Sequence, residues 1–114
     1  MKKIKLLQNF EFANINEIKS CDVGGIIYNN KSNDIMNKNE INELIEYLYN
    51  NNFIKNEKLI IEKNSIITIL NDNIYDDITI QINDKLSLLC NGDMFTKIDN
   101  YNNDDYYVNA ITMK

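Results

Sequence analysis

The chain has 114 residues, 44% of them hydrophobic and 25% charged, and a formal net charge of −5, which is typical of one globular domain spanning residues 1–114. It contains no histidine and no arginine, which excludes a Ser–His or Cys–His nucleophile pair, an imidazole metal ligand and an arginine clamp on phosphate. Asp, Glu, Lys and Tyr remain available for acid–base chemistry, but this composition favours a non-enzymatic protein without a cofactor or a metal.

The N-terminal sequence MKKIKLL is basic, but Gln8, Asn9 and Glu11 interrupt it before an apolar run long enough for a signal peptide or a membrane span. We therefore expect a cytoplasmic protein whose two cysteines, at positions 21 and 90, stay reduced. A strand is predicted over Ile4–Gln8. A one-turn helix is predicted to begin at Asn14, where Glu17 three residues later completes a partial capping box.

The segment DVGGII, residues 22–27, places two glycines beside an apolar run, within a strand predicted over Val23–Asn29. It does not continue to the Gly-Lys-Ser/Thr of a phosphate-binding loop. The glycines therefore indicate a bulge or the close approach of another backbone.

The clearest element is an amphipathic helix within Asn37–Phe53, covering about residues 39–50. Asn37 or Asn39 can cap its start. One apolar stripe is expected to be buried, and the two tyrosines that flank it, Tyr47 and Tyr49, are expected to be partly exposed. The stripe consists of Ile41, Leu44, Ile45 and Leu48.

The second half of the chain alternates like a series of strands. They are predicted over Lys58–Lys63, Ser65–Asn71, Asp77–Ile82, Leu86–Cys90, Met94–Ile98 and Tyr106–Thr112. A three-residue connection at 83–85 keeps the apolar face continuous, because it sets Ile82 opposite Leu86, Ile80 opposite Leu88 and Ile78 opposite Cys90. The dipeptide Asn91-Gly92 is a strong hairpin signal that would set Leu88 opposite Phe95. Residues 77–98 are thus predicted to form a three-stranded meander. The predicted fold class is α+β, with one main helix packed on an antiparallel, meander-containing sheet.

Negative charge is concentrated in residues 71–105, where eight aspartates and two lysines give −6, whereas residues 1–70 hold nine carboxylates and nine lysines. Residues 71–77 and 99–105 look like calcium loops, but both lack the Gly at position six and the Glu at position twelve of an EF-hand. Aspartate is common in turns for local reasons. As a group, however, these aspartates would repel nucleic acid and attract basic proteins.

The segment YNNDDYYV, residues 101–108, combines three tyrosines with two adjacent carboxylates. One interpretation is a turn that leads into the last strand, with the tyrosines packed on the sheet. The other is an exposed patch, since tyrosines are enriched where proteins meet. The candidate partner-binding residues are Asp76, Asp77, Asp99, Tyr101, Asp104, Asp105, Tyr106 and Tyr107.

We therefore expect an acidic interaction module that binds and inhibits a basic partner, such as a nucleic-acid-binding protein, and that binds neither nucleic acid nor membranes itself. Two settings fit: an immunity protein that masks a toxin, and a phage-encoded inhibitor of a host nuclease or defence complex that mimics nucleic acid. One alternative is a small-molecule binder with a pocket between helix and sheet, lined by tyrosines and asparagines. Another is a structural subunit that forms homo-oligomers through a sheet edge.

Overall fold

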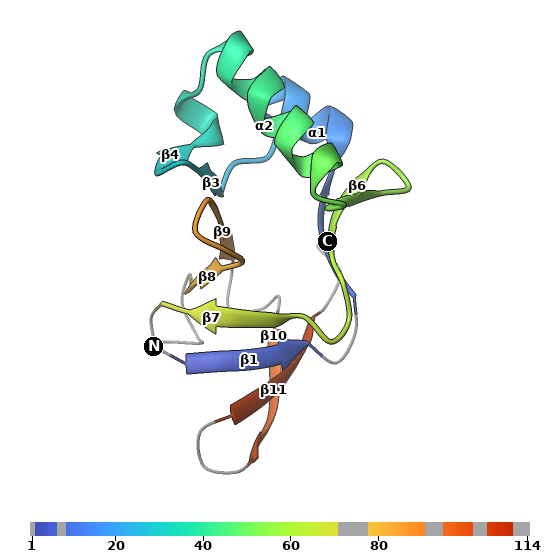
Figure 1. Cartoon of the computed structure of the whole chain (residues 1–114), viewed down its shortest axis with the longest axis vertical. Helices are drawn as coiled ribbons and strands as arrows, with labels where there is room; N and C mark the ends of the chain where they lie inside the picture. The colour runs from blue at the N-terminus through green and yellow to red at the C-terminus, as the bar shows by residue number, and fades with distance from the viewer. Residues whose placement is uncertain (1, 7–8, 71–77, 91–94, 102–104, 111–114) are drawn as a thin grey trace.

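The computed structural model describes residues 2–6, 9–70, 78–90, 95–101 and 105–110 (Figure 1). The helices are α1 (Ile15–Ser20), α2 (Lys38–Asn50) and a 3-10 turn, η1 (Asn33–Ile35). The strands are β1 (Lys2–Leu6), β2 (Phe10–Asn14), β3 (Ile26–Tyr28), β4 (Lys31–Ser32), β5 (Ile54–Lys55), β6 (Lys58–Ile61), β7 (Ile66–Ile69), β8 (Ile78–Gln81), β9 (Leu86–Cys90), β10 (Phe95–Tyr101) and β11 (Asp105–Ala110).

The strands form two sheets, and the predicted α+β class is confirmed. The large sheet has the order β10-β11-β1-β7-β8-β9-β3-β4, and the small sheet has the order β2-β6-β5. All the pairings are antiparallel except that of β1 with β11, which is parallel. Figure 1 shows α1 and α2 together at one end of the elongated molecule, and β1, β10 and β11 at the other end.

Both helices begin with a capping box; the sequence predicts the box at Asn14 and the cap at Asn37, but not the reciprocal bond from Glu40. At α2, the Asn37 side chain accepts the backbone N–H of Glu40, and the Glu40 carboxylate accepts the backbone N–H of Asn37. Asn14 and Glu17 make the same reciprocal pair at α1. Each pair satisfies backbone N–H groups that a helix start would otherwise leave without partners. The predicted apolar stripe of α2 is buried in the core.

The predicted register between residues 78 and 90 is also confirmed. Ile78 pairs with Cys90 and Ile80 pairs with Leu88. The row continues through Ile69 on one side and Ile26 on the other, and its members Ile26, Ile69, Ile80 and Leu88 are all buried. This row and the α2 stripe belong to one hydrophobic cluster, so the helix and the sheet share a core.

The strand predicted over Met94–Ile98 is present as β10, but its predicted pairing with β9 as the third strand of a meander is wrong. Leu88 does not pair with Phe95, because β3 occupies that edge of β9 and sets Ile26 opposite Leu88. Phe95 pairs instead with Ala110, at the far end of the large sheet. Residues 91–92, which carry the turn signal, lie outside the described residues. The pairing of β3 with β9 completes a continuous apolar row, and this outweighs the local preference for a hairpin.

The glycine pair allows a close backbone approach, as predicted. Gly25 has φ +87°, and a Cβ built there would lie 2.9 Å from the carbonyl oxygen of Leu89. The Leu89 N–H donates to the Gly25 carbonyl at 2.7 Å. Cys21 is exposed, Cys90 is buried, and no disulfide joins them.

Strand β2 is an element that the sequence reasoning did not predict. It brings Phe10 and Phe12 into the core, where their rings pack edge to face with centroids 6.2 Å apart. Among the described residues, no helix combines the length and the hydrophobicity that crossing a bilayer requires.

Candidate functional site

Five of the eight predicted partner-binding residues come together in the β10–β11 hairpin. The paired positions are Asp99 with Tyr107 and Tyr101 with Asp105, and Tyr106 pairs with Asn100 between them. The other three predicted residues, Asp76, Asp77 and Asp104, lie outside the described residues. The backbone therefore unites the tyrosine–aspartate segment with Asp99 at one end of the large sheet.

This hairpin lies next to the basic strand β1, which contains Lys2, Lys3 and Lys5. Lys5 pairs with Tyr107, and Tyr107 pairs with Asp99, so the row sets a lysine and an aspartate two strands apart. Two strand spacings are about 10 Å, close to the Debye length at physiological ionic strength. The strands β10 and β11 together hold two aspartates and one lysine, so the three lysines of β1 outnumber the net negative charge beside them.

A second candidate site is a surface groove of about 300 Å³ between α2 and β3, which we call the Tyr–Glu groove. Tyr28, the last residue of β3, forms one side. The other lining residues come from α2 and its C-cap: Glu43, Glu46, Tyr47, Asn50 and Asn51. Positions three and four residues apart lie on one face of a helix, so α2 presents them together.

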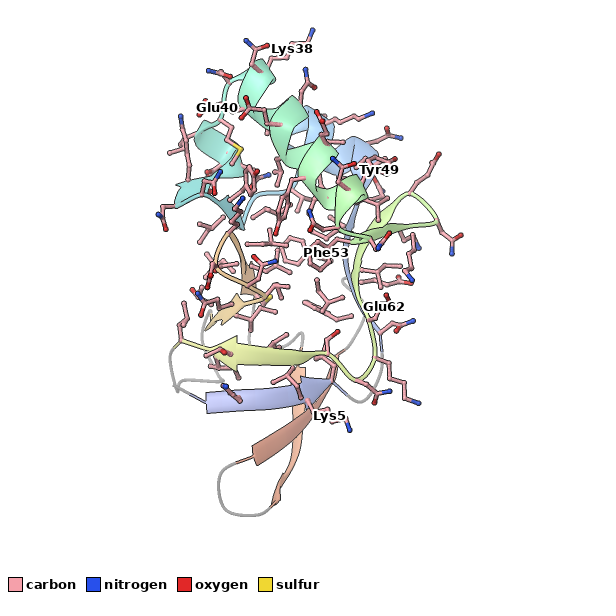
Figure 2. All side chains as sticks on the ribbon, viewed as in Figure 1. Lys5, Lys38, Glu40, Tyr49, Phe53 and Glu62 are labelled. Carbon is pink, nitrogen blue, oxygen red and sulfur yellow. The ribbon has the colours of Figure 1, made fainter. Side chains whose placement is uncertain are left out.

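Two tyrosine rings in contact form the centre of the groove. The Tyr28 and Tyr47 ring centroids lie 4.7 Å apart with the planes inclined at 40°, and Tyr47 also packs on Phe53 at 6.3 Å. Figure 2 shows Phe53 just below the C-terminal end of α2, and Tyr49, which is half exposed, on the helix. Because Tyr28 of β3 and Phe53, which precedes β5, both contact Tyr47, its ring is held in place.

A hydrogen bond fixes the outer end of Tyr47. The Asn83 side-chain amide donates to the Tyr47 hydroxyl at 2.8 Å. The side-chain carbonyl oxygen of Asn83 in turn accepts the backbone N–H groups of Lys85 and Leu86 at 2.8 and 2.9 Å. The turn between β8 and β9 thus positions a tyrosine that belongs to α2.

Glu43 and Glu46 are exposed at the rim of the groove. Within the part of the chain that the structure describes, neither forms an ion pair, whereas the carboxylates of other surface regions do so in the pairs Lys31–Glu40, Lys55–Glu62 and Lys58–Glu11. The groove therefore combines an aromatic centre with negative charge that no described lysine neutralises.

Glu40, one turn before the groove, differs from these two glutamates. The backbone N–H of Asn37 and the ammonium of Lys31 both donate to its carboxylate and lower the pKa of Glu40 below its usual value. The Glu40 carboxylate already caps the helix and pairs with Lys31. The charge on α2 that is available to a partner is that of Glu43 and Glu46.

This arrangement is suited to binding a cation. The face of a tyrosine ring attracts ammonium and guanidinium groups, and carboxylates accept their hydrogen bonds. A volume of about 300 Å³ lies at the lower end of the range for small-ligand sites, so the groove matches one long side chain better than a large ligand. No cluster of three or more Cys, Asp or Glu side chains that could hold a metal occurs among the described residues.

The sequence reasoning missed Tyr28, Glu43 and Glu46. One signal for the helical part was present, because Glu43, Tyr47 and Asn50 follow the i, i+4, i+7 spacing of a helix face. Nothing local points to Tyr28, which reaches the groove only through the pairing of β3 with β9. Comparisons with protein-family models, curated proteins and solved structures found no match.

Proposed function

We propose that this protein is a non-enzymatic, acidic interaction module that binds a basic partner protein by holding a lysine or arginine side chain in the Tyr–Glu groove. The observation that carries the proposal is the pairing of the Tyr28–Tyr47 rings with Glu43 and Glu46, two carboxylates without a described ion-pair partner. A cation there would contact an aromatic face and a carboxylate at the same time.

Long-range charge supports the same partner. The net charge of −5 would attract a basic surface before contact and speed the encounter. The −6 segment at 71–105 supplies the net negative charge of the chain, and its part in β10 and β11 lies beside the three lysines of β1. Arginine suits the groove especially well, because its planar guanidinium both stacks on tyrosine and bonds carboxylates in pairs.

The biological setting that we propose is inhibition. A module of this kind would mask the basic surface of a nucleic-acid-binding protein, as an immunity protein masks a toxin or a phage-encoded inhibitor blocks a host nuclease. The absence of histidine and arginine, together with the acidic charge, supports a masking role over a catalytic one.

Short oligo-arginine and oligo-lysine peptides are suitable probes, with an oligo-glutamine peptide as the neutral control. We expect the cationic peptides to bind, with affinity that falls as salt is raised. In NMR titrations, the shifted amide resonances should centre on α2 and β3. Shifts centred on β10 and β11 would move the site to the hairpin instead.

A pair of double variants with equal net charge tests the groove itself. Glu43→Gln with Glu46→Gln should weaken peptide binding about five-fold, since the ion pairs of a bound cation with these two exposed carboxylates contribute about 1 kcal/mol. Glu57→Gln with Glu62→Gln removes the same charge from the exposed β5–β6 region and should change affinity much less. Equal losses from the two variants would show that general charge, not the groove, determines binding.

The hairpin is tested separately by Asp104→Asn with Asp105→Asn, which should leave the fold intact and weaken capture of a basic partner. Unchanged affinity in this variant would limit the interaction to α2 and β3.

A second candidate function follows from the same groove. Its tyrosine and asparagine lining agrees with the predicted pocket between helix and sheet, so a small quaternary ammonium compound is an alternative ligand. A rise in melting temperature across a panel of such compounds, without binding of cationic peptides, would favour it.

A further inference from the structure

The outer face of the large sheet carries apolar side chains that remain exposed. Along β7 and β9, buried residues of the core alternate with residues that point to the opposite side of the sheet. On that side Ile66 of β7 is 57% exposed and Leu89 of β9 is 41% exposed. Leu70, just after β7, is 40% exposed and donates its N–H to the Thr79 carbonyl of β8. Three of the five exposed large hydrophobic residues in the described part of the chain therefore lie on one face.

This face is also uncharged over four strands. A row of uncharged side chains crosses β7, β8, β9 and β3: Thr68, Gln81, Ser87 and Ile27. Charged residues make up 25% of the chain, yet neither this row nor the next one, from Leu70 through Thr79 to Leu89, contains any. Exposed apolar groups together with a depletion of charge are typical of the centre of a protein interface.

Two lysines border the face on its β1 side. Lys3 pairs with Thr68 and Lys5 pairs with Ile66, so both lysines lie on the outer face. Lys3 is exposed and Lys5 is half-buried. Among the residues that the structure describes, neither forms an ion pair. The face thus combines an apolar centre with two cations along one border.

The dimensions and the charge of the face fit an amphipathic helix. β7 and β9 are two strand spacings apart, about 10 Å, which is the diameter of an α-helix. Thr79 on β8 is shorter than Leu70 and Leu89 in the same row, so a helix lying along β8 can contact a leucine on each side. Carboxylates along one flank of that helix would accept hydrogen bonds from the lysines of β1.

A second copy of this chain fits the face less well. If two copies packed face to face, the described rows would bring no carboxylate to Lys3 or Lys5. The two cations would then lose water without gaining an anionic partner, which is unfavourable. The charge pattern therefore favours a different chain that supplies the carboxylates.

We propose that the outer face of the large sheet binds an amphipathic helix of a partner protein that carries carboxylates along one side of its apolar stripe. The inference is independent of the Tyr–Glu groove, because α2 packs against the other face of the sheet. Figure 1 shows both helices on one side of β7. Because the two sites attract opposite charges, one molecule can bind a basic and an acidic partner at the same time.

Burial of apolar surface provides most of the affinity at this face. The net charge of −5 does not attract an acidic helix from a distance. Raising the salt concentration should therefore change the affinity little, in contrast to cation binding in the Tyr–Glu groove. The two lysines determine which helix binds and in which orientation.

Three designed helical peptides of about 18 residues test the charge preference. The first has leucines at i, i+3, i+4 and i+7 and glutamates along one side of this stripe, and the second has lysines in place of the glutamates. The third has the composition of the first in scrambled order. Affinities are measured from the amide resonances of β7, β8 and β9, so that binding of the lysine peptide in the Tyr–Glu groove does not contribute. We expect the first peptide to bind, the second to bind about five-fold more weakly or less, and the third not to bind.

A matched pair of isoleucine variants tests the apolar centre. Ile66→Ser should weaken binding of the glutamate peptide about five-fold or more. Ile35→Ser is the control, because Ile35 is 68% exposed but belongs to η1 rather than to the sheet, and it should leave the affinity unchanged. Far-UV circular dichroism of each variant separates lost folding from lost binding.

A matched pair of charge reversals tests the lysine border. Lys3→Glu with Lys5→Glu should reverse the preference, so that the lysine peptide binds more tightly to the sheet face than the glutamate peptide. Lys19→Glu with Lys38→Glu makes the same change of net charge on the two helices and should keep the wild-type preference.

Equal binding of the glutamate and lysine peptides, equal losses from the two isoleucine variants, or no binding of any peptide would overturn the proposal. A wild-type chain that sediments as a dimer, and that becomes monomeric with Ile66→Ser, would also overturn it, because the face would then belong to a second copy.

Discussion

Asn33 is the one buried polar side chain among the described residues, and its replacement by aspartate tests how the segment that leads into β3 is held. Its Oδ1 accepts the Ile26 N–H at 3.0 Å, and its Nδ2 donates to the Val23 carbonyl at 2.7 Å. Asn33→Asp keeps the shape and the acceptor but removes the donor, so a carboxylate oxygen faces the Val23 carbonyl. The lost bond and the partly buried Val23 carbonyl left without this donor together should cost about 2 kcal/mol of unfolding free energy.

The pH dependence of this loss has a defined sign. Burial beside a carbonyl oxygen favours the protonated form of the introduced carboxyl, so its pKa is higher in the folded than in the unfolded state. A group of this kind destabilises most above its folded-state pKa, and the loss shrinks as the pH falls, because the protonated carboxyl can donate to Val23. Asn33→Leu, which removes both hydrogen bonds and cannot ionise, should show no such recovery.

Urea denaturation followed by circular dichroism measures these free energies, with an unchanged m value as the check that the unfolded states are comparable. Asn42→Asp, at an exposed position of α2, is the matched control and should stay within about 0.5 kcal/mol of wild type. An Asn33→Asp protein as stable as the control, or one whose deficit grows toward low pH, would refute the reasoning.

Three further predictions concern the core, the glycine pair and the helix cap. Ile80→Asp buries a carboxylate in the fully covered row of the large sheet and should abolish the cooperative thermal transition; a wild-type melting temperature would contradict the face assignment. Gly25→Ala should cost about 1–2 kcal/mol or more in urea titrations, because φ is +87° and the new Cβ meets a β9 carbonyl oxygen, whereas Gly24→Ala has only ordinary contacts and should cost less; equal costs would contradict this account. The pKa of Glu40 is lowered in the folded state, so its contribution to the free energy of unfolding is present above the usual pKa of 4.5 and is lost as the pH falls through the folded-state pKa. Glu40→Gln should therefore reduce the loss of stability that the wild type shows at acid pH. Parallel curves of stability against pH for the variant and the wild type would argue against the cap.

Elements whose determinants lie within a few residues could be predicted from the sequence. The α2 stripe, the asparagine cap of α2 and the capping box of α1 depend on spacings of three and four residues, and all are present in the structure. The pairing of Ile80 with Leu88 could also be predicted, because a one-residue slip would turn an apolar face outward.

Pairings between distant strands could not be predicted in this way. The Asn91-Gly92 signal favours a hairpin, yet the edge of β9 belongs to β3, which comes much earlier in the chain. Strand β2 was missed because its five residues precede α1 directly, and its strand character comes from pairing with β6. In both cases the deciding contact is tertiary, so local propensity carries little information about it.

The same distinction between local and tertiary determinants applies to the candidate site. Composition identified acidic charge and tyrosines, and the structure unites Asp99, Tyr101 and Tyr107 in one hairpin. The Tyr–Glu groove needs both α2 and β3, so the helical spacing of Glu43 and Tyr47 alone did not reveal it. A site assembled from two elements becomes visible only when their packing is known.

The central position of β1 affects how the chain is made. Ile4 pairs with Ile67 in β7 and with Tyr106 in β11, so both partners of this early strand are synthesised long after it. During synthesis on the ribosome, the backbone N–H and C=O groups of β1 therefore have no strand partner until β7 and β11 have been made. This favours slow formation of the sheet and leaves β1 open to contact with other nascent chains. The lysines at positions 2, 3 and 5 lie within β1 itself, and repulsion between like charges disfavours pairing of this strand with the same strand of another unfinished copy.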